Sequence, residues 1–371
     1  MNSGTFIDTG FGYKAFSPIS LMEVEKKLKL NELQNNLEKA NISIGELRAL
    51  ELLLPNPELI TQRYAIKEAL LSSMIEGTQS TLVEIFENKD NTSAANDVRE
   101  VQNYFKALNH GIDSIKTNRL PLSLRLLQEC HQILMDNVRG GEPEKKKGEF
   151  RNSQNWIGGN SPKAAVFVPP QSSEVISLMG DLEKYLYAGK LPDLIKIALA
   201  HYQFETIHPF LDGNGRIGRL LIPLFLISNG ILNYPTMYLS LYFKKLKMDY
   251  YDLLMDVRNR GSYERWIRFF LEGIIKVSNQ IMDTTKKILM LEERDKSLVS
   301  SKNEIALLEQ LFKLPTTNIK HIEEVLHISN NTANSLAKKF ESLGILKQTN
   351  TLQRNKKYIY EQYMNIIEAE L

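Results

Sequence analysis

Twelve residues between His208 and Arg219, reading HPFLDGNGRIGR, combine the side chains needed to handle a phosphate group. His208 can accept a proton near neutral pH, and Asp212 can hold a divalent cation through its carboxylate. The glycines around Asn214 let backbone N–H groups close on an anion. An apolar run over residues 220–227 predicts a buried helix directly behind the loop. The loop therefore lies at the N-terminus of a predicted helix, where anions are favoured.

The composition of the whole chain limits the function classes. Its 371 residues suffice for two or three domains, with 43% apolar and 24% charged residues. No apolar run has the length needed to cross a bilayer, and the N-terminus does not have the pattern of a secretory signal. Cys130 is the only cysteine, so we expect no intramolecular disulfide, a cytoplasmic location and no membrane partner. The formal net charge of +2 gives no global reason to expect nucleic acid.

Helical periodicity dominates the first 280 residues and predicts a mainly α architecture that positions this loop. After an irregular start, we expect a helical cover over residues 1–60, then a helix from Glu58 to Glu76 that ends at Gly77. Two helices are expected within residues 96–139. The remaining helices expected in this part of the chain are Ser173–Tyr187, Asp193–Ile207, Met248–Val257 and Glu264–Val277.

The other histidines of this region have no companions at metal-ligand spacing. His110 and His131 are interpreted as packing or surface residues. His201 lies two helical turns before His208, and we interpret it as a core histidine or as a support for the site.

One long segment, residues 140–171, interrupts the helical pattern with five glycines and four prolines. Loops of this length inside compact domains are more often functional than incidental. A strand is expected from Ala164 to Val168, closed by Pro169 and Pro170. The segment is therefore predicted to be a functional loop or hairpin, with a structural crossover as the alternative.

The chain beyond residue 280 has a different pattern. A charged connecting helix is expected first, followed by helices at 304–314, 319–326 and 331–343. Two strands, at 345–349 and 357–363 around the turn 350–355, complete a predicted winged helix-turn-helix. The third helix and the wing are locally basic, through Lys338, Lys339, Lys347, Arg354, Lys356 and Lys357. Acidic residues nearly balance this charge, so DNA binding, protein interaction and homodimerisation all stay open.

HPFLDGNGRIGR resembles the signature of the Fic (filamentation induced by cAMP) family, H-x-F-x-[D/E]-G-N-G-R-x-x-R, at every specified position. GEFRNSQNWIGG with the following FVPP is similar to the family's flap region. YLSLYFKKLKMDYYDLLMDVR is similar to the segment downstream of the signature, although Leu246 stands where asparagine is common. SSMIEG, residues 72–77, resembles the inhibitory motif [S/T]-x-x-x-E-[G/N] that lies N-terminal to the core in class II members.

This resemblance implies a Fic-type helical core with a short β-hairpin flap and a C-terminal winged helix-turn-helix. The regions would be 1–95 (helical, with the inhibitory motif), 96–280 (catalytic core), 281–300 (connecting helix) and 301–371 (winged-helix-like). The implied reaction transfers AMP from ATP to a Ser, Thr or Tyr hydroxyl of a target protein or of the chain itself.

The resemblance also implies a role for each site residue. His208 would be the catalytic base and Asp212 the ligand of Mg²⁺. Val166 and Phe167 would bind an extended target segment along the edge of the flap. The implied contacts to ATP and its phosphates are Gly213, Asn214, Gly215, Arg216, Ile217, Gly218, Arg219 and Tyr250.

Glu76, together with Ser72 and Gly77, is interpreted as an inhibitory element. Its carboxylate would pair with Arg219 and exclude the γ-phosphate of ATP from that arginine. The alternative is a helix end with a solvated glutamate. Two other functions stay open: a Fic-type enzyme that removes AMP or transfers another phosphate-containing group, and an ATP-sensing regulator that binds DNA.

Overall fold

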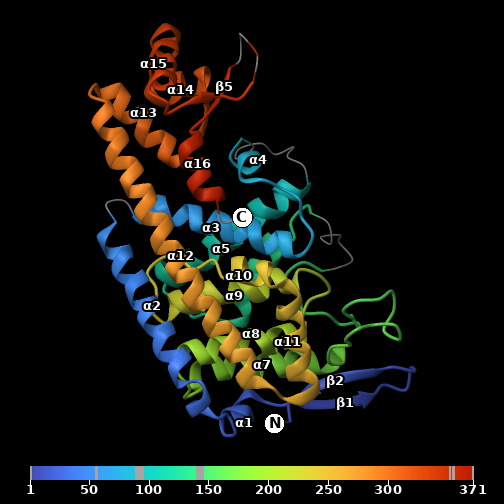
Figure 1. The fold of residues 1–371 in the computed structure, drawn as a ribbon. Coiled ribbons are helices and arrows are strands. Elements are labelled where there is room, and N and C mark those ends of the chain that lie inside the picture. The colour runs from blue at the N-terminus through green and yellow to red at the C-terminus, as the bar shows by residue number, and fades with distance from the viewer. Residues whose placement is uncertain are drawn as a thin grey trace.

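The computed structural model describes residues 2–54, 57–87, 96–138, 146–350, 352 and 356–369. These residues are mainly helical, as the sequence predicts, with two small antiparallel sheets. The long helices α2 (Gln34–Leu53) and α12 (Tyr263–Leu298) run side by side along one flank, and a smaller C-terminal unit stands at one end (Figure 1). No helix in the described ranges is both long enough and apolar enough to cross a membrane.

The centre of the molecule is formed by α8 (Asp193–Ile207) and α9 (Asn214–Ser228), which pack against each other. Every residue of α8 from Leu194 to Ile207 is buried, as expected for a helix surrounded by other helices. Their connection, residues 208–213, is therefore held at both ends by the core. The other core helices are α1 (Leu21–Glu25), α3 (Pro57–Ile75), α4 (Leu82–Glu87), α5 (Asn96–Lys116), α6 (Leu124–Leu134), α7 (Val175–Ala188), α10 (Ser240–Lys245) and α11 (Lys247–Arg260).

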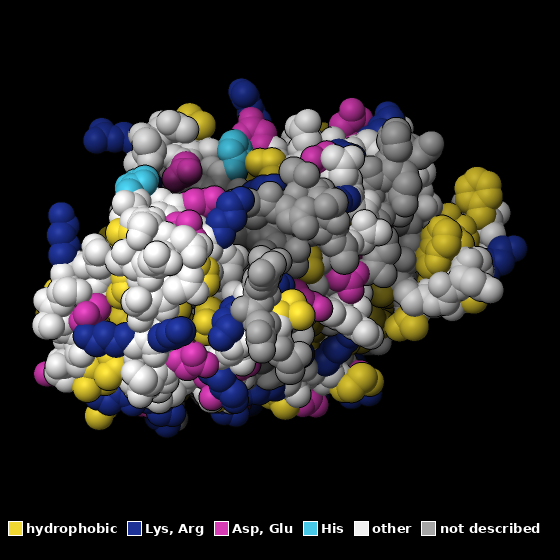
Figure 2. All heavy atoms as spheres, turned by 90° about the horizontal axis from the view of Figure 1, so that it is seen from above, with side chains coloured by type: hydrophobic (Ala, Val, Ile, Leu, Met, Phe, Trp, Pro, Cys, Tyr) yellow, Lys and Arg dark blue, Asp and Glu magenta, His cyan; other side chains and the backbone are white. Residues whose placement is uncertain are grey.

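The first residues form a β-hairpin, which the sequence did not predict. β1 (Gly4–Asp8) pairs antiparallel with β2 (Lys14–Pro18). The hairpin is joined to the flap segment, because the Phe16 N–H donates to the Val168 carbonyl at 3.0 Å and the Phe16 ring packs on Phe167. In the view from above, it projects from the body with apolar side chains on its surface (Figure 2). These tertiary contacts explain why an apparently irregular start is ordered.

The expected connecting helix is not a separate element. α12 runs without a break for 36 residues and crosses the predicted boundary at residue 280. No proline interrupts it, and its apolar stripe continues through Ile281, Ile288 and Leu291, which are buried. The core and the C-terminal unit therefore share one rigid helix.

The C-terminal unit contains the three expected helices and a three-stranded sheet with the strand order β3-β5-β4. Its elements are α13 (Lys302–Lys313), β3 (Thr316–Asn318), α14 (Ile319–Leu326), α15 (Asn330–Ser342), β4 (Lys347–Gln348), β5 (Lys357–Ile359) and α16 (Glu361–Glu368). The strand predicted over 357–363 is too long: the chain turns at Tyr360 into α16. That helix buries Tyr363, Met364 and Ile367 against the core.

Classification of this unit as a winged helix-turn-helix stays a prediction. Most of the expected turn at 350–355, including Arg354, lies outside the described residues. Two of the lysines expected to make the unit basic are paired, Lys339 with Glu304 at 2.7 Å and Lys347 with Glu361. In the view from above, Lys and Arg side chains are interspersed with Asp and Glu side chains (Figure 2).

Candidate active site

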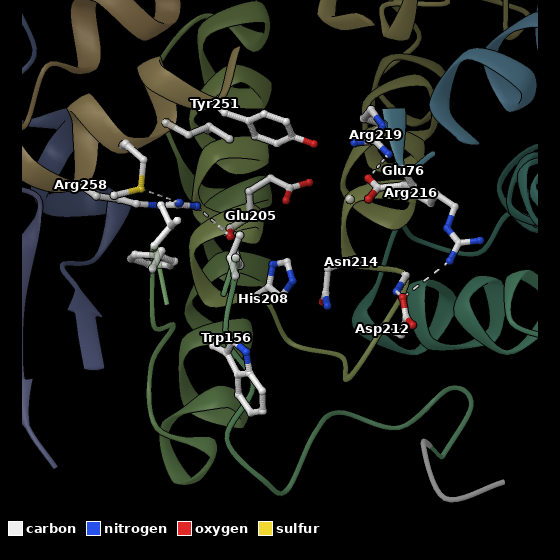
Figure 3. Close-up of a pocket in the computed structure, with 18 of the residues that line it drawn as sticks. Glu76, Trp156, Glu205, His208, Asp212, Asn214, Arg216, Arg219, Tyr251 and Arg258 are labelled. Carbon is white, nitrogen blue, oxygen red and sulfur yellow. Dashed lines mark hydrogen bonds and ion pairs between the residues drawn. The ribbon is translucent and has the colours of Figure 1, made fainter. Parts of the chain in front are cut away.

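His208 ends α8 in the left-handed backbone conformation, with φ 52° and ψ 60°. This costly conformation is held because the His208 carbonyl accepts hydrogen bonds from Arg151 Nε at 2.9 Å and Asn155 Nδ2 at 3.1 Å. The side chain lines a cavity of about 710 Å³ (Figure 3). Burial, aided by Arg258 and Arg151, lowers the pKa of His208 to about 4, so the imidazole is neutral at physiological pH.

The loop after His208 is closed by Asn214. Its side-chain amide accepts from the Phe210 N–H and donates to the Phe210 carbonyl, both at 2.8 Å. The Phe210 ring stacks on His131 with the centroids 3.8 Å apart. Because His131 Nδ1 accepts from the Gly148 N–H at 2.9 Å, its Nε2 donates to the Asp212 carbonyl at 3.1 Å. His131 is therefore more than a packing residue, since it fixes the loop that carries Asp212.

The glycines around Asn214, expected to let backbone N–H groups close on an anion, lie at the start of α9. Gly213, with φ 74°, precedes α9, whose first turn has no side-chain cap. Gly213, Asn214 and Gly215 line the cavity, so the uncapped helix N-terminus faces it. Ile217 and Gly218, which the resemblance also implied as ATP contacts, do not line the cavity: Ile217 is fully buried in the core, and Gly218 packs against other side chains behind the wall.

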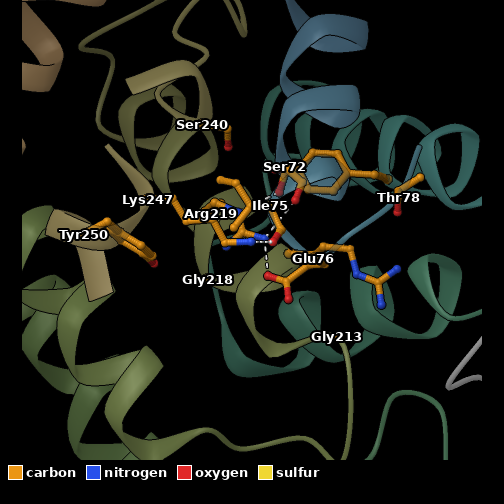
Figure 4. Close-up of polar contacts among 12 residues, drawn as sticks. Ser72, Ile75, Glu76, Thr78, Gly213, Gly218, Arg219, Ser240, Lys247 and Tyr250 are labelled. Carbon is orange, nitrogen blue, oxygen red and sulfur yellow. Dashed lines mark hydrogen bonds and ion pairs between the residues drawn. The ribbon is translucent and has the colours of Figure 1, made fainter. Parts of the chain in front are cut away.

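Arg219 is almost completely buried and meets the end of α3, as predicted (Figure 4). Its Nη2 lies 2.6 Å from Glu76 Oε1, and its Nε donates to Ser72 Oγ at 2.8 Å. Burial would raise the pKa of the Glu76 carboxyl, but Arg219 outweighs it and holds the pKa below the ordinary value. Gly77, with φ 100°, turns the chain immediately after Glu76. Glu76 is thus an ion-pair partner of Arg219 and not a solvated helix end.

Arg216 lies near two carboxylates. Its Nη1 is 3.5 Å from Glu100 Oε2, and its Nη2 is 3.8 Å from Asp212 Oδ1. Glu100 lines the cavity but was not predicted from the sequence, because it comes from α5, far from the motif. Arg216 is therefore balanced by negative charge on two sides.

Asp212 fits the expected magnesium ligand in character. Its carboxylate lines the cavity with 40% of the side chain exposed. No group of three or more His, Cys, Asp or Glu in the described part of the chain is arranged to hold a metal. Mg²⁺ commonly uses one or two protein carboxylates together with substrate phosphates, so a single carboxylate beside an anion cradle suits it.

The flap differs from the prediction. Residues 164–168 form no strand, and their pairing with the preceding part of the flap is limited to an isolated antiparallel bridge between Ile157 and Phe167. Left-handed glycines at 158 and 159 and a turn at Ser161–Ala164 leave too little extended backbone for a ladder. Val166 is 68% exposed, but Phe167 is buried, with the Arg258 guanidinium 3.9 Å from its ring centroid. Of the two predicted docking residues, only Val166 offers its side chain to a partner.

Tyr250, which the resemblance implied as a contact to ATP, does not line the cavity. It is fully buried, and its hydroxyl donates to His201 Nε2 at 2.9 Å, while His201 Nδ1 donates to the Gly218 carbonyl at 2.8 Å. Its neighbour Tyr251 lines the cavity instead. His201 therefore supports the site through hydrogen bonds between α8, α9 and α11. Leu246 lines a separate groove, outside the cavity.

Glu205 and Arg258 also line the cavity and were not predicted. Glu205 lies three residues before His208 on α8, so helical spacing alone could have placed it near the site. Arg258 donates to Thr206 Oγ1 at 3.1 Å and to the Glu205 carbonyl at 3.0 Å. No local spacing signals Arg258, because it comes from α11.

Two segments of the sequence match profiles of known protein families. Residues 34–113 match the Fic/DOC family N-terminal profile, and residues 121–226, which include the motif, match the Fic/DOC family profile. The chain belongs to the Fic/DOC family and carries its N-terminal region.

Similar curated proteins and solved structures agree with this assignment. A protein adenylyltransferase Fic of Drosophila willistoni is 29% identical over 225 residues, 60% of this chain and 41% of that protein. The relative from Drosophila virilis is 30% identical over 203 residues, 54% of this chain and 38% of that protein. The chain thus spans about two fifths of the length of these relatives.

Among solved structures, a Fic family protein from Desulfovibrio desulfuricans G20 has a TM-score of 0.55 and 19% identity, and covers 89% of this chain and 95% of its own. A Fic domain containing signaling protein from Bacteroides thetaiotaomicron has a TM-score of 0.51 and 18% identity, covering 66% of this chain and 95% of its own. At this identity, these matches show the shared helical fold.

Proposed function

We propose that this chain is a protein adenylyltransferase that transfers AMP from ATP to a hydroxyl side chain of a target protein or of itself. The proposal rests on one observation: a neutral His208, an uncapped helix N-terminus and two buried arginines line the same cavity. The distant relatives named protein adenylyltransferase support the reaction class.

In the proposed reaction, the target hydroxyl oxygen attacks the α-phosphorus of ATP. His208 takes the hydroxyl proton, the bond from the α-phosphorus to the β-phosphate oxygen breaks, and pyrophosphate leaves. Backbone N–H groups at the start of α9 stabilise the charge that develops on the phosphate oxygens, and Arg216 and Arg219 bind the others through planar guanidinium groups. Asp212 would hold Mg²⁺, which neutralises phosphate charge when bound.

We further propose that the chain is autoinhibited by Glu76. Because the Glu76 carboxylate occupies Arg219, a terminal phosphate cannot bind that guanidinium. ATP would then bind with its α-phosphate misaligned for attack. A Cβ at Gly215 would lie 2.3 Å from Glu76 Oε1, so the absence of a side chain at this position leaves room for the glutamate. The target segment would bind beside Val166 on the flap.

Intact-mass analysis of the Glu76→Gly protein after incubation with ATP and Mg²⁺ tests the proposal. We expect a gain of one or more AMP groups. A different added mass, or stronger modification with another nucleotide triphosphate, would favour another phosphate-group transfer. Loss of AMP from a previously modified protein would favour removal instead. An unchanged mass with every nucleotide and added target lysate would contradict transfer altogether.

A further inference from the structure

Glu205 on α8 is an acidic side chain of the cavity wall to which the proposed transfer gives no role. It is 6% exposed and lies between Tyr251 and His208 in the cavity wall (Figure 3). Its Oε1 is buried and has no hydrogen-bond partner among the described residues. A buried carboxylate oxygen without a donor is strongly disfavoured in the ionised form, so this position requires a physical explanation.

The neighbours of Glu205 fix its backbone and leave space for its carboxyl. Arg258 Nη2 donates to the Glu205 backbone carbonyl at 3.0 Å, which fixes this turn of α8. On α9, a Cβ at Gly218 would lie 2.4 Å from Glu205 Oε1. Glycine at 218 thus leaves the space that the carboxyl occupies, at the wall of the cavity.

Each element packed around Glu205 brings a charged or titratable group toward it. Arg219 comes from α9, Glu76 from the end of α3, and Arg258 from α11. The phenols of Tyr250 and Tyr251 also face it from α11, and His208 follows it on the loop. Burial raises the pKa of Glu205 to about 7; Glu76 adds to the rise, and Arg219 and Arg258 oppose it.

We propose that Glu205 is a positioning residue that takes up a proton when a nucleotide binds and then donates an O–H hydrogen bond to a nucleotide oxygen. The inference rests on the proposed function, since it concerns the same nucleotide site. Bound ATP brings several negative phosphate charges into a cavity that already holds the Glu76 carboxylate on Arg219. Like charges across a cavity of low dielectric disfavour the ionised carboxylate. The proton comes from solvent and converts the carboxylate into a carboxylic acid.

This proton uptake makes nucleotide affinity depend on pH. Below pH 7, Glu205 is already largely protonated in the free protein, and binding needs no further proton. Above pH 7 the free carboxyl is ionised while the bound one holds its proton, so affinity falls by up to about tenfold for each pH unit. A residue with a merely structural role would not produce this slope.

The test is isothermal titration calorimetry of the full chain with ATP and Mg²⁺ at pH 8, in two buffers that differ in ionisation enthalpy. We expect the wild type to take up close to one more proton per ATP than Glu205→Gln, which is neutral at any pH and keeps a donor. Asp252→Asn, which alters another acidic residue of the cavity wall, is the matched control and should take up as many protons as the wild type.

The outcomes separate this inference from the proposed function. Equal proton uptake by the wild type and Glu205→Gln would overturn the role of Glu205 and leave the proposed function intact. If Glu205→Gln does not fold, the wild type alone decides, because constant ATP affinity from pH 7 to 9 would overturn the inference equally. No ATP binding by any variant would overturn the nucleotide site itself.

Discussion

Replacement of Glu76 by glycine tests the contact on which the proposed autoinhibition depends. The carboxylate lies 2.6 Å from Arg219 Nη2, and its side chain is 37% exposed, while that of Arg219 is 1% exposed. Hydrogen bonds to charged groups contribute roughly 1.5–3 kcal/mol. Because Glu76 is partly solvated, we take the lower part of this range, about 1.5–2 kcal/mol. A factor of ten in an equilibrium constant corresponds to about 1.4 kcal/mol. Loss of the Glu76 carboxylate therefore favours phosphate binding to Arg219 by roughly ten- to thirtyfold.

The assay for this prediction is labelling of protein by α-³²P-ATP with Mg²⁺. We expect Glu76→Gly to label about ten- to thirtyfold faster than the wild type, and Glu76→Gln, which loses only the charge, to lie between them. Gln79→Gly is the matched control, since it places a glycine at an exposed position three residues further on. An unchanged labelling rate in Glu76→Gly would refute the inhibitory reading of the ion pair.

Three further predictions follow from the packing around the site. His208→Ala should abolish AMP transfer while calorimetry still detects ATP binding; full residual transfer would exclude His208 as the base. Tyr250→Phe should lower the free energy of unfolding in urea by about 1–3 kcal/mol, because buried His201 Nε2 loses its donor. Tyr363→Ala should lower it by about 3–5 kcal/mol, because a buried ring 4.2 Å from the Arg63 guanidinium is removed. Urea unfolding at the wild-type midpoint in either tyrosine variant would contradict the corresponding contact.

Local sequence was enough to predict the elements that carry the motif. α8 begins and ends at the residues predicted, and α9 follows the loop as expected, because closely spaced apolar residues recur along both helices, Pro192 precedes α8 and Gly213 precedes α9. The errors concern segments whose order depends on distant partners. The hairpin at residues 4–18 and helix α16 are stabilised by contacts with other parts of the chain, which no local pattern reports.

For the candidate site too, some features follow from the local sequence and others depend on tertiary contacts. By itself, the sequence determined that His208, Asp212 and the arginines share one short loop and helix, because their spacing is local. Only the tertiary structure decided which side chains complete the cavity. Glu76 pairs with an arginine 143 residues away. On α11, a shift of one position, about a quarter turn of the helix, places Tyr251 instead of Tyr250 at the cavity. Such choices depend on how helices are rotated against one another, which is set by packing across the whole core.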